Sequence, residues 1–276
     1  MLHFIIGKVG AGKTTALHKL IAKRVKEENA QVILIVPKQF TFDTDSSVLD
    51  ILGPKDACNV QVLSFSRLAD TVLKTCRGIK KPPLSDGANA IIMSLALESL
   101  QEKLEFFSKH SGNISFVKKI LSEIKSFKQS AVLPEELLAA SVKLPDGILK
   151  KKLQETALIY ETYNALVETS FYDDGDLLTI IYEILKDSRF FENKIVALDD
   201  FSNFSVQELK IISLMLKEAE DVYVTACCDS IFSVPLSSPF ARSVTTVNRL
   251  RTLAAKEGVA VSSPVIITDE GEGFST

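Results

Sequence analysis

Hydrophobic residues in this chain gather in short, unbroken runs that alternate with stretches of helical period. The runs are LHFII (2–6), QVILIV (31–36), VQVLS (60–64), KIVALD (194–199) and DVYVTACC (221–228). They are rich in Val, Ile and Leu and lack clean polar–apolar alternation, which is typical of parallel strands covered on both faces. Because helical stretches separate the runs, we predict an α/β fold with a parallel sheet and helices on both faces.

The alternation breaks once, between the third and fourth strands. Roughly 130 residues separate them, far more than an ordinary crossover needs. Apolar residues recur there at helical spacing, in the sets Phe116, Val117, Ile120, Leu121, Ile124, Phe127 and Leu149, Leu153, Ala157, Tyr160. We therefore predict an all-helical subdomain at 80–171, inserted between core segments 1–79 and 172–276. Pro134 should begin one of its helices. The acidic, Gly-rich tail after Val265 should be frayed.

The loop after the first strand has the sequence GKVGAGKTT. Gly7, Gly12, Lys13 and Thr14 satisfy the pattern G-x-x-x-x-G-K-[ST]. The loop lies between an apolar strand and an amphipathic helix, which is the context that a phosphate-binding P-loop requires. A glycine-rich turn without a ligand is the alternative. The complete motif in this context favours the P-loop, and hence a RecA-like core.

Each part of this loop has a chemical role. Glycines let the backbone N–H groups converge on phosphate oxygens, and the N-terminus of the following helix favours an anion. Lys13 would reach the β- and γ-phosphates of ATP, and the Thr14 hydroxyl would bind Mg²⁺. The predicted nucleotide-binding residues are Gly7, Gly10, Ala11, Gly12, Lys13, Thr14 and Thr15.

The fourth strand ends in two carboxylates, Asp199 and Asp200. Asp199 at the strand tip would orient Mg²⁺ near Thr14. Many ATPases place Glu at the next position, where it activates the attacking water. Asp200 is one methylene shorter and is a weaker candidate for a catalytic base. The alternative for both residues is a solvated strand end.

These motifs occur in an order that is similar to a known family. VQVLSFSRLADTVL, and DDGDLLTIIYEIL running into KIVALDDF, resemble UvrD/Rep-type superfamily 1 helicases. The ordered set FIIGKVGAGKT, LIVPKQFTFDTD, VQVLSFSRLADTVL and DDFSNFSVQELKIISLMLKEAEDVYV resembles the N-terminal region of the B subunit of AddAB helicase–nucleases, which process double-strand DNA ends. The resemblance spans nearly the whole chain.

The resemblance implies a function and partners. It implies that the chain is an ATP-binding, helicase-like module of a DNA-repair enzyme. It also implies that the enzyme is a heterodimer with an A subunit and that it contacts single-stranded DNA and double-stranded DNA ends. By position in the motifs, it places Gln39, Ser64, Phe65, Ser66 and Arg67 at the DNA. Hydroxyls and Arg can bind phosphates, and Phe can stack on a base. The local alternative is that Ser64 or Ser66 caps a helix and Phe65 belongs to the core.

The chain also departs from the family pattern. An adenine-reading glutamine is missing before Gly7, and CCDSIF (227–232) lacks the glutamine that couples ATP to DNA. The second RecA-like domain with its arginine finger, the nuclease and the iron–sulfur cluster of the family lie outside these residues. We therefore expect ATP binding with weak or no turnover.

Charge, hydropathy and cysteine spacing restrict the classes of function that the chain can have. The net charge of −3 gives no global nucleic-acid signature, so any DNA contact must be local. No apolar run is long enough to span a membrane and no signal-peptide pattern occurs, so we expect a cytoplasmic protein without a membrane partner. The four cysteines have no C-x-x-C spacing, and we expect reduced thiols.

Two other functions remain open. One is a stand-alone P-loop kinase or ATPase for a small molecule, with the helical insertion as a lid over the substrate. The other is a binding module whose helicase core no longer binds nucleotide. The SFSRL segment and the long insertion favour the helicase-like module.

Overall fold

The structure, a computed structural model, describes residues 1–76, 84–108, 113–168, 171, 173, 175–228 and 238–268. The chain divides into two compact units, Met1–Arg77 with Ile181–Thr276, and Gly78–Ile180. The first unit contains a parallel sheet with flanking helices, and the described part of the second is helical, which confirms the α/β class. The predicted boundaries of the helical subdomain, near 80 and 171, lie partly outside the described residues.

The sheet has six strands in the order β3-β2-β4-β5-β1-β6, and all neighbours are parallel. The strands are β1 (Leu2–Gly7), β2 (Gln31–Ile35), β3 (Val60–Leu63), β4 (Lys194–Leu198), β5 (Asp221–Cys227) and β6 (Val265–Ile267). The first five correspond to the predicted runs. Their order places β5 between β1, which leads into the P-loop, and β4, which leads into Asp199.

The sixth strand corrects the prediction of a frayed tail. Ile5 and Ile6 of β1 pair with Val265 and Ile266, so the chain is ordered through the start of that tail. Ile267 is buried in the sheet core. Three apolar residues are too few to show a strand period, because short runs have no distinctive pattern. Residues 269–276 lie outside the described part.

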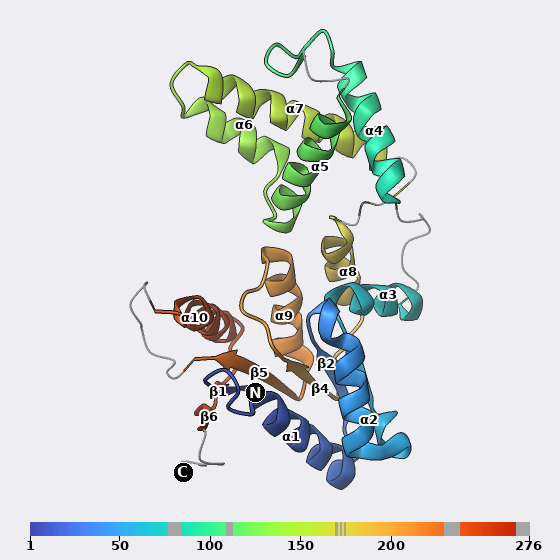
Figure 1. The fold of residues 1–276 in the computed structure, drawn as a ribbon, viewed down its shortest axis with the longest axis vertical. Helices are drawn as coiled ribbons and strands as arrows, with labels where there is room; N and C mark the ends of the chain where they lie inside the picture. Colours follow the sequence, from blue (N-terminus) through green and yellow to red (C-terminus); the bar gives the residue numbers. More distant parts are fainter. Residues whose placement is uncertain are drawn as a thin grey trace. The chain divides into compact units, whose positions relative to one another are not determined.

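Helices cover both faces of the sheet (Figure 1). They are α1 (Lys13–Glu28), the 3₁₀ turn η1 (Lys38–Phe40), α2 (Thr41–Ala57), α3 (Phe65–Thr75), α8 (Leu177–Leu185), α9 (Val206–Glu218) and α10 (Ala241–Lys256). Leu17 and Ile21 of α1 and Val48 of α2 pack on Val32 and Ala197 of the sheet. The opposite face carries α9 and α10.

Two helix ends follow signals that are visible in the sequence. Ser205 caps α9 by accepting from the Glu208 N–H at 3.2 Å, and Glu208 accepts in return from the Ser205 N–H at 2.7 Å. After α10, Gly258 has φ +70°, and the Val259 N–H donates to Ala254 O, as in a Schellman motif. These contacts define where α9 begins and where α10 ends.

The second unit packs its helices around a separate apolar core. They are α4 (Asp86–Ser99), α5 (Ile114–Gln129), α6 (Pro134–Val142) and α7 (Ile148–Glu168). The predicted stripe on α5 is buried at Val117, Ile120 and Ile124, and Pro134 begins α6 as expected. The prediction of the second stripe was wrong at its first residue, because Leu149 lies in the first turn of α7 and is 60% exposed.

A buried lysine ties α5 to the segment before α8. The Lys128 ammonium lies 3.0 Å from Asp173 Oδ2 and 2.5 Å from Asp176 Oδ2, and only 1% of its side chain is exposed. A buried charge requires such partners. The Glu155 carboxylate on α7 similarly accepts three backbone N–H groups, those of residues 105–107. Both contacts hold irregular segments against the helices.

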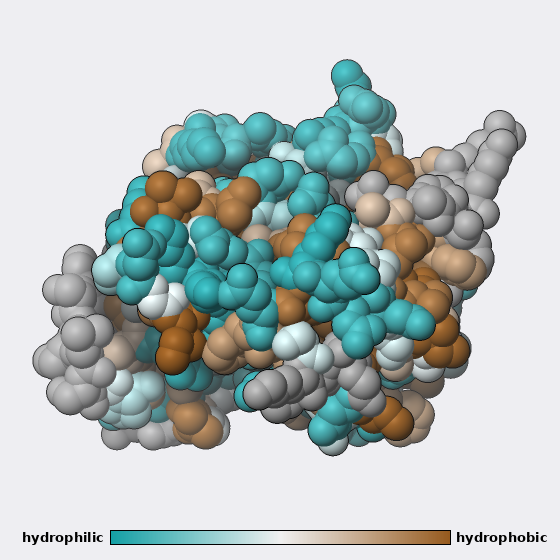
Figure 2. Space-filling model, turned by 90° about the horizontal axis from the view of Figure 1, so that it is seen from above, coloured by the Kyte–Doolittle hydropathy of each residue, from teal (hydrophilic) through white to brown (hydrophobic). Residues whose placement is uncertain are grey.

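The surface is mainly polar. Viewed from above, hydrophilic residues surround separate hydrophobic patches (Figure 2). Exposed apolar side chains of the second unit include Leu138, Val142 and Ile148, near the turn between α6 and α7. Across the described ranges, no helix combines the length and the apolar character that crossing a membrane requires.

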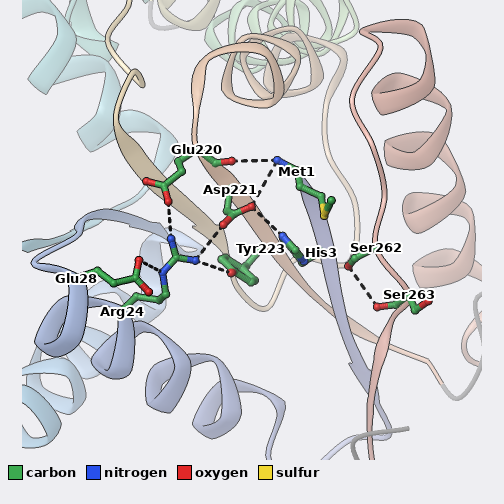
Figure 3. Close-up of polar contacts among 9 residues, drawn as sticks. All are labelled: Met1, His3, Arg24, Glu28, Glu220, Asp221, Tyr223, Ser262 and Ser263. Carbon is green, nitrogen blue, oxygen red and sulfur yellow. Dashed lines mark hydrogen bonds and ion pairs between the residues drawn. The ribbon is translucent and has the colours of Figure 1, made fainter. Parts of the chain in front are cut away.

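An ion network joins the amino-terminal ends of β1 and β5 to α1 (Figure 3). The Arg24 guanidinium donates to Asp221 Oδ2 at 3.0 Å, to Glu220 Oε1 at 2.6 Å and to Glu28 Oε2 at 2.7 Å. His3 Nε2 lies 2.9 Å from the other Asp221 oxygen. Burial alone would raise the pKa of Asp221, but the hydrogen bonds from His3 and Arg24 hold it below its usual range.

We predict that Asp221→Asn destabilises the first unit by about 1.5–3 kcal/mol at neutral pH, the usual range for hydrogen bonds to charged groups. Because the folded pKa of Asp221 is lowered, its contribution is present above the ordinary value of 3.8 and is lost as the pH falls through the folded value. Urea unfolding at neutral and acid pH measures the difference. Glu28→Gln is the control, since the Glu28 side chain is 49% exposed. Equal losses in both variants would contradict the prediction.

Candidate nucleotide-binding site

The P-loop backbone adopts a conformation that its glycines make possible. Gly10 and Gly12 have φ of +82° and +90°, which side chains of L-residues rarely tolerate. A Cβ at either position would meet no atom within 4 Å, so the space above the loop is open. Gly12 is the N-cap of α1 and has no side chain to cap it. The first N–H groups of α1 therefore remain for an anion.

Gly7 is required for a different reason. A Cβ there would lie 2.7 Å from Ile267 O and 3.3 Å from the Ala11 Cβ. The carbonyl belongs to β6. This strand, which the sequence pattern did not predict, therefore restricts the first position of the motif to glycine. At the other end of the loop, Lys13 Nζ donates to Lys8 O at 2.7 Å, which holds the ammonium against the loop backbone.

Asp199 is the buried acceptor at this edge of the sheet. The residue is 3% exposed and follows β4 directly, with its N–H donating to Ile35 O at 3.0 Å. Its Oδ1 accepts from the Thr14 hydroxyl at 3.3 Å and from the Thr225 hydroxyl at 2.6 Å. Thr14 and Asp199 thus meet as predicted, although they are 185 positions apart in the sequence.

Thr225 is a site residue that the sequence analysis missed. It lies on β5, between the strands that lead into the P-loop and into Asp199, and it is 3% exposed. Its hydroxyl donates to Asp199 and accepts from the Asp200 N–H at 3.1 Å. A threonine in a buried strand carries no signal of this role until the strand order is known.

Asp200 has an unusual backbone conformation, with φ +60°. Burial of its carboxyl group and the negative charge of Asp199 raise its pKa, while Lys13 opposes them. The repulsion exists because two carboxylates follow one strand. The role of Asp200 as a base stays a prediction.

The predicted DNA-contact residues lie after β2 and β3. Gln39 in η1 and Ser66 and Arg67 in α3 are exposed. Ser64 caps α3 by accepting from the Arg67 N–H at 3.3 Å, and Phe65 is 6% exposed and packs edge-on against Phe201. This arrangement matches the local alternative for Ser64 and Phe65, and it leaves the other three side chains accessible. Residues 229–232 of CCDSIF lie outside the described part.

The oxygens at this edge fit Mg²⁺. The Thr14 hydroxyl and the Asp199 carboxylate are hard oxygen donors in contact, and Mg²⁺ commonly takes one or two protein ligands with phosphates and waters. No cluster of three His, Cys, Asp or Glu side chains that could hold a metal occurs within the described ranges. A metal here would thus depend on the phosphates of a bound nucleotide.

The sequence is similar to known proteins along nearly its whole length. A family model described as "ADDB, N-terminal" matches residues 4–275. This chain belongs to the ADDB N-terminal family. It is 33% identical over 266 residues to the B subunit of the ATP-dependent helicase/deoxyribonuclease of Caldanaerobacter subterraneus subsp. tengcongensis, covering 96% of this chain and 23% of that protein. The protein of the same name from Clostridium perfringens is 30% identical over 271 residues, covering 98% and 23%. The chain therefore spans less than a quarter of these relatives.

In this ADDB N-terminal chain, we predict that Thr225→Val lowers the free energy of unfolding by about 1–3 kcal/mol. The substitution keeps the shape of the side chain but leaves the buried Asp199 with one donor fewer, and such losses lie in this range. Thermal unfolding in EDTA measures this loss, which should lower Tm by about 2–4 °C per kcal/mol. Thr225→Ser keeps the hydroxyl and should lose less; a valine variant as stable as the parent would show that the bond contributes nothing.

Proposed function

We propose that this chain is the ATP-binding, helicase-like module of a helicase–nuclease B subunit that acts in double-strand-break repair. The observation that carries the proposal is the meeting of the open P-loop, Thr14 and Asp199 at one edge of the sheet. Family membership supports the assignment to the B subunit. The A subunit of the complex is the proposed partner.

The residues of the site have distinct parts in nucleotide binding. Gly10 and Gly12 present backbone N–H groups to the phosphates, whereas the Ala11 N–H donates to Lys8 O at 3.3 Å. Lys13 leaves the same Lys8 carbonyl to bind the β- and γ-phosphates. Thr14 and Asp199 would hold Mg²⁺, which supplies charge neutralisation at the phosphates when it is bound. Thr225 keeps the Asp199 carboxylate in place.

Single-stranded DNA is the proposed second ligand. The loops after β2 and β3 leave from the carboxyl ends of parallel strands, where open α/β sheets bind ligands. Gln39, Ser66 and Arg67 are exposed there and can bind phosphates. Arg67 lies 3.7 Å from Asp45, a weak exposed pair that a phosphate could replace.

Mg·ATP should stabilise the first unit. At about 100 times its Kd, a ligand adds about 2.7 kcal/mol, which corresponds to roughly 5–10 °C in Tm for a domain of this size. Thermal unfolding of the full chain with millimolar Mg·ATP measures the shift. Lys13→Ala is the control and should abolish it, since its contacts to phosphate are lost. An unshifted Tm in the parent chain would refute nucleotide binding.

Hydrolysis by this chain alone should be slow, and single-stranded DNA should not accelerate it much. Asp200 is shorter than the Glu that would reach the water, and a misplacement of order 1 Å can cost about 10²-fold. An arginine finger, worth about 10³–10⁵ in rate, would have to come from another domain. Phosphate release is measured with and without DNA, against Lys13→Ala. Turnover near 1 s⁻¹ that depends on Lys13 would contradict this.

A further inference from the structure

The outer surface of α10 carries a strong local positive charge that the site as described does not use. Its cations are Arg242, Arg249, Arg251 and Lys256, and all four are exposed. The helix contains no Asp or Glu, whereas the chain as a whole has a net charge of −3. Among the described residues no ion pair involves any of the four, and the Glu257 carboxylate that follows the helix is bound by Lys217 at 2.8 Å.

The stability of the helix does not explain this charge. The helix dipole favours a cation near the carboxyl end and disfavours one near the amino end. Lys256 in the last turn follows this preference, but Arg242 lies in the first turn and opposes it. Arg242 is therefore placed as a cation that serves an external anion would be.

Three of the cations form a column along one flank of α10. Arg242, Arg249 and Lys256 are spaced seven residues apart, which is close to two helical turns. At a rise of about 1.5 Å per residue, the column is about 21 Å long. Arg251 lies on the opposite flank, because two residues turn the helix by about 200°. A nucleic acid strand, which repeats a negative charge along its length, fits such a column.

The loop after β4 connects the column to the proposed DNA surface. In this loop, Asn203 Oδ1 accepts from the Arg249 guanidinium at 3.2 Å. Phe201 of the same loop packs edge-on against Phe65 of α3, with 5.7 Å between the ring centroids. Arg67, a residue of the proposed DNA surface, lies in the first turn of α3. The loop thus contacts α3 on one side and α10, which packs against β5 (Figure 1), on the other.

We propose that the column on α10 binds the phosphates of single-stranded DNA and extends the DNA path beyond Arg67. This inference rests on the proposed function, which supplies the ligand. Continuity with the surface at Arg67, through the loop after β4, favours a single strand over a duplex. At Arg249, a phosphate oxygen would replace the neutral amide of Asn203 as the acceptor.

The contact should be independent of the DNA sequence. Stacking of bases requires aromatic side chains, and α10 contains none. Contacts between cations and phosphates fix the position of a strand but do not distinguish its bases. The α10 column would therefore hold the strand, while any reading of bases would have to occur elsewhere on its path.

The salt dependence of DNA binding tests the proposal on the full chain. Each phosphate contact to a single strand adds about 0.7 to the slope of log K against log salt concentration. A labelled oligo(dT) is titrated by fluorescence anisotropy at several salt concentrations. Arg249→Gln should reduce the slope by about 0.7, which weakens binding roughly fivefold at about 0.1 M salt. The double variant Arg242→Gln/Arg249→Gln should lose twice as much slope.

Arg251→Gln is the matched control, because it removes the same charge from the opposite flank of the same helix. It should keep the slope of the parent chain. Arg249→Lys retains the charge and should also keep that slope. If the role of Arg249 were only to hold Asn203, Arg249→Gln would lower Tm and leave the slope intact, which would overturn the proposal. Equal losses of slope in Arg249→Gln and Arg251→Gln would indicate general attraction without a column and would also overturn it.

Other ligands give different results. A hairpin duplex replaces oligo(dT) in a second set of titrations. If the α10 variants lose slope with the duplex and not with oligo(dT), the assignment to a single strand is wrong. If the column serves an acidic protein segment, the variants bind both DNAs as the parent chain does, and the proposal fails.

Two outcomes separate this inference from the proposed function. If oligo(dT) binds to the parent chain and Arg67→Gln weakens that binding while the α10 variants do not, the inference fails and the proposed function stands. If oligo(dT) does not bind to the parent chain, the proposed DNA contact fails and the inference fails with it.

Discussion

The buried carboxylate of Asp199 is the constraint on which the arrangement of the first unit depends. An ionised group with 3% exposure is costly unless donors surround it. Its donors come from two other elements, Thr225 on β5 and Thr14 on α1. The sheet order, with β5 next to both β1 and β4, brings these elements together. The requirement to satisfy one carboxylate thus ties the P-loop to the rest of the sheet.

The two ends of the sheet use charge in opposite ways. At the amino-terminal ends, Arg24 donates to three carboxylates, and His3 contacts the remaining oxygen of Asp221. That network is closed within the protein and holds α1 to β5. At the carboxyl ends, Gly12 leaves the first N–H groups of α1 uncapped, and Gly10 and Gly12 face open space. A ligand can therefore add contacts at the carboxyl ends of the strands. At the amino-terminal ends it would first have to break the existing ion pairs.

Local signals made much of this structure predictable from the sequence. Apolar runs located five strands, Pro134 marked the start of α6, and the glycine-rich motif located the open loop after β1, because each signal depends on neighbouring residues. Thr225 could not be found this way. Its role arises from a contact with Asp199, 26 positions away in the sequence, and that contact follows from the strand order. Phe65 shows the same limit. The sequence pattern of an aromatic residue after a strand is the same whether that residue binds a base or, as here, packs on Phe201.

Asp200 shows how a position can contribute to the site through its backbone. Its N–H donates to the Thr225 hydroxyl, which in turn donates to Asp199, so the left-handed conformation at Asp200 helps to orient the carboxylate. That contact is independent of the side chain. Burial of the side chain and the negative charge of Asp199 raise its pKa, and Lys13 opposes them. A base must also reach the water, and Asp200 is one methylene shorter than the Glu that many ATPases place at this position. In the proposed function, this edge would therefore hold a nucleotide more effectively than it would cleave one.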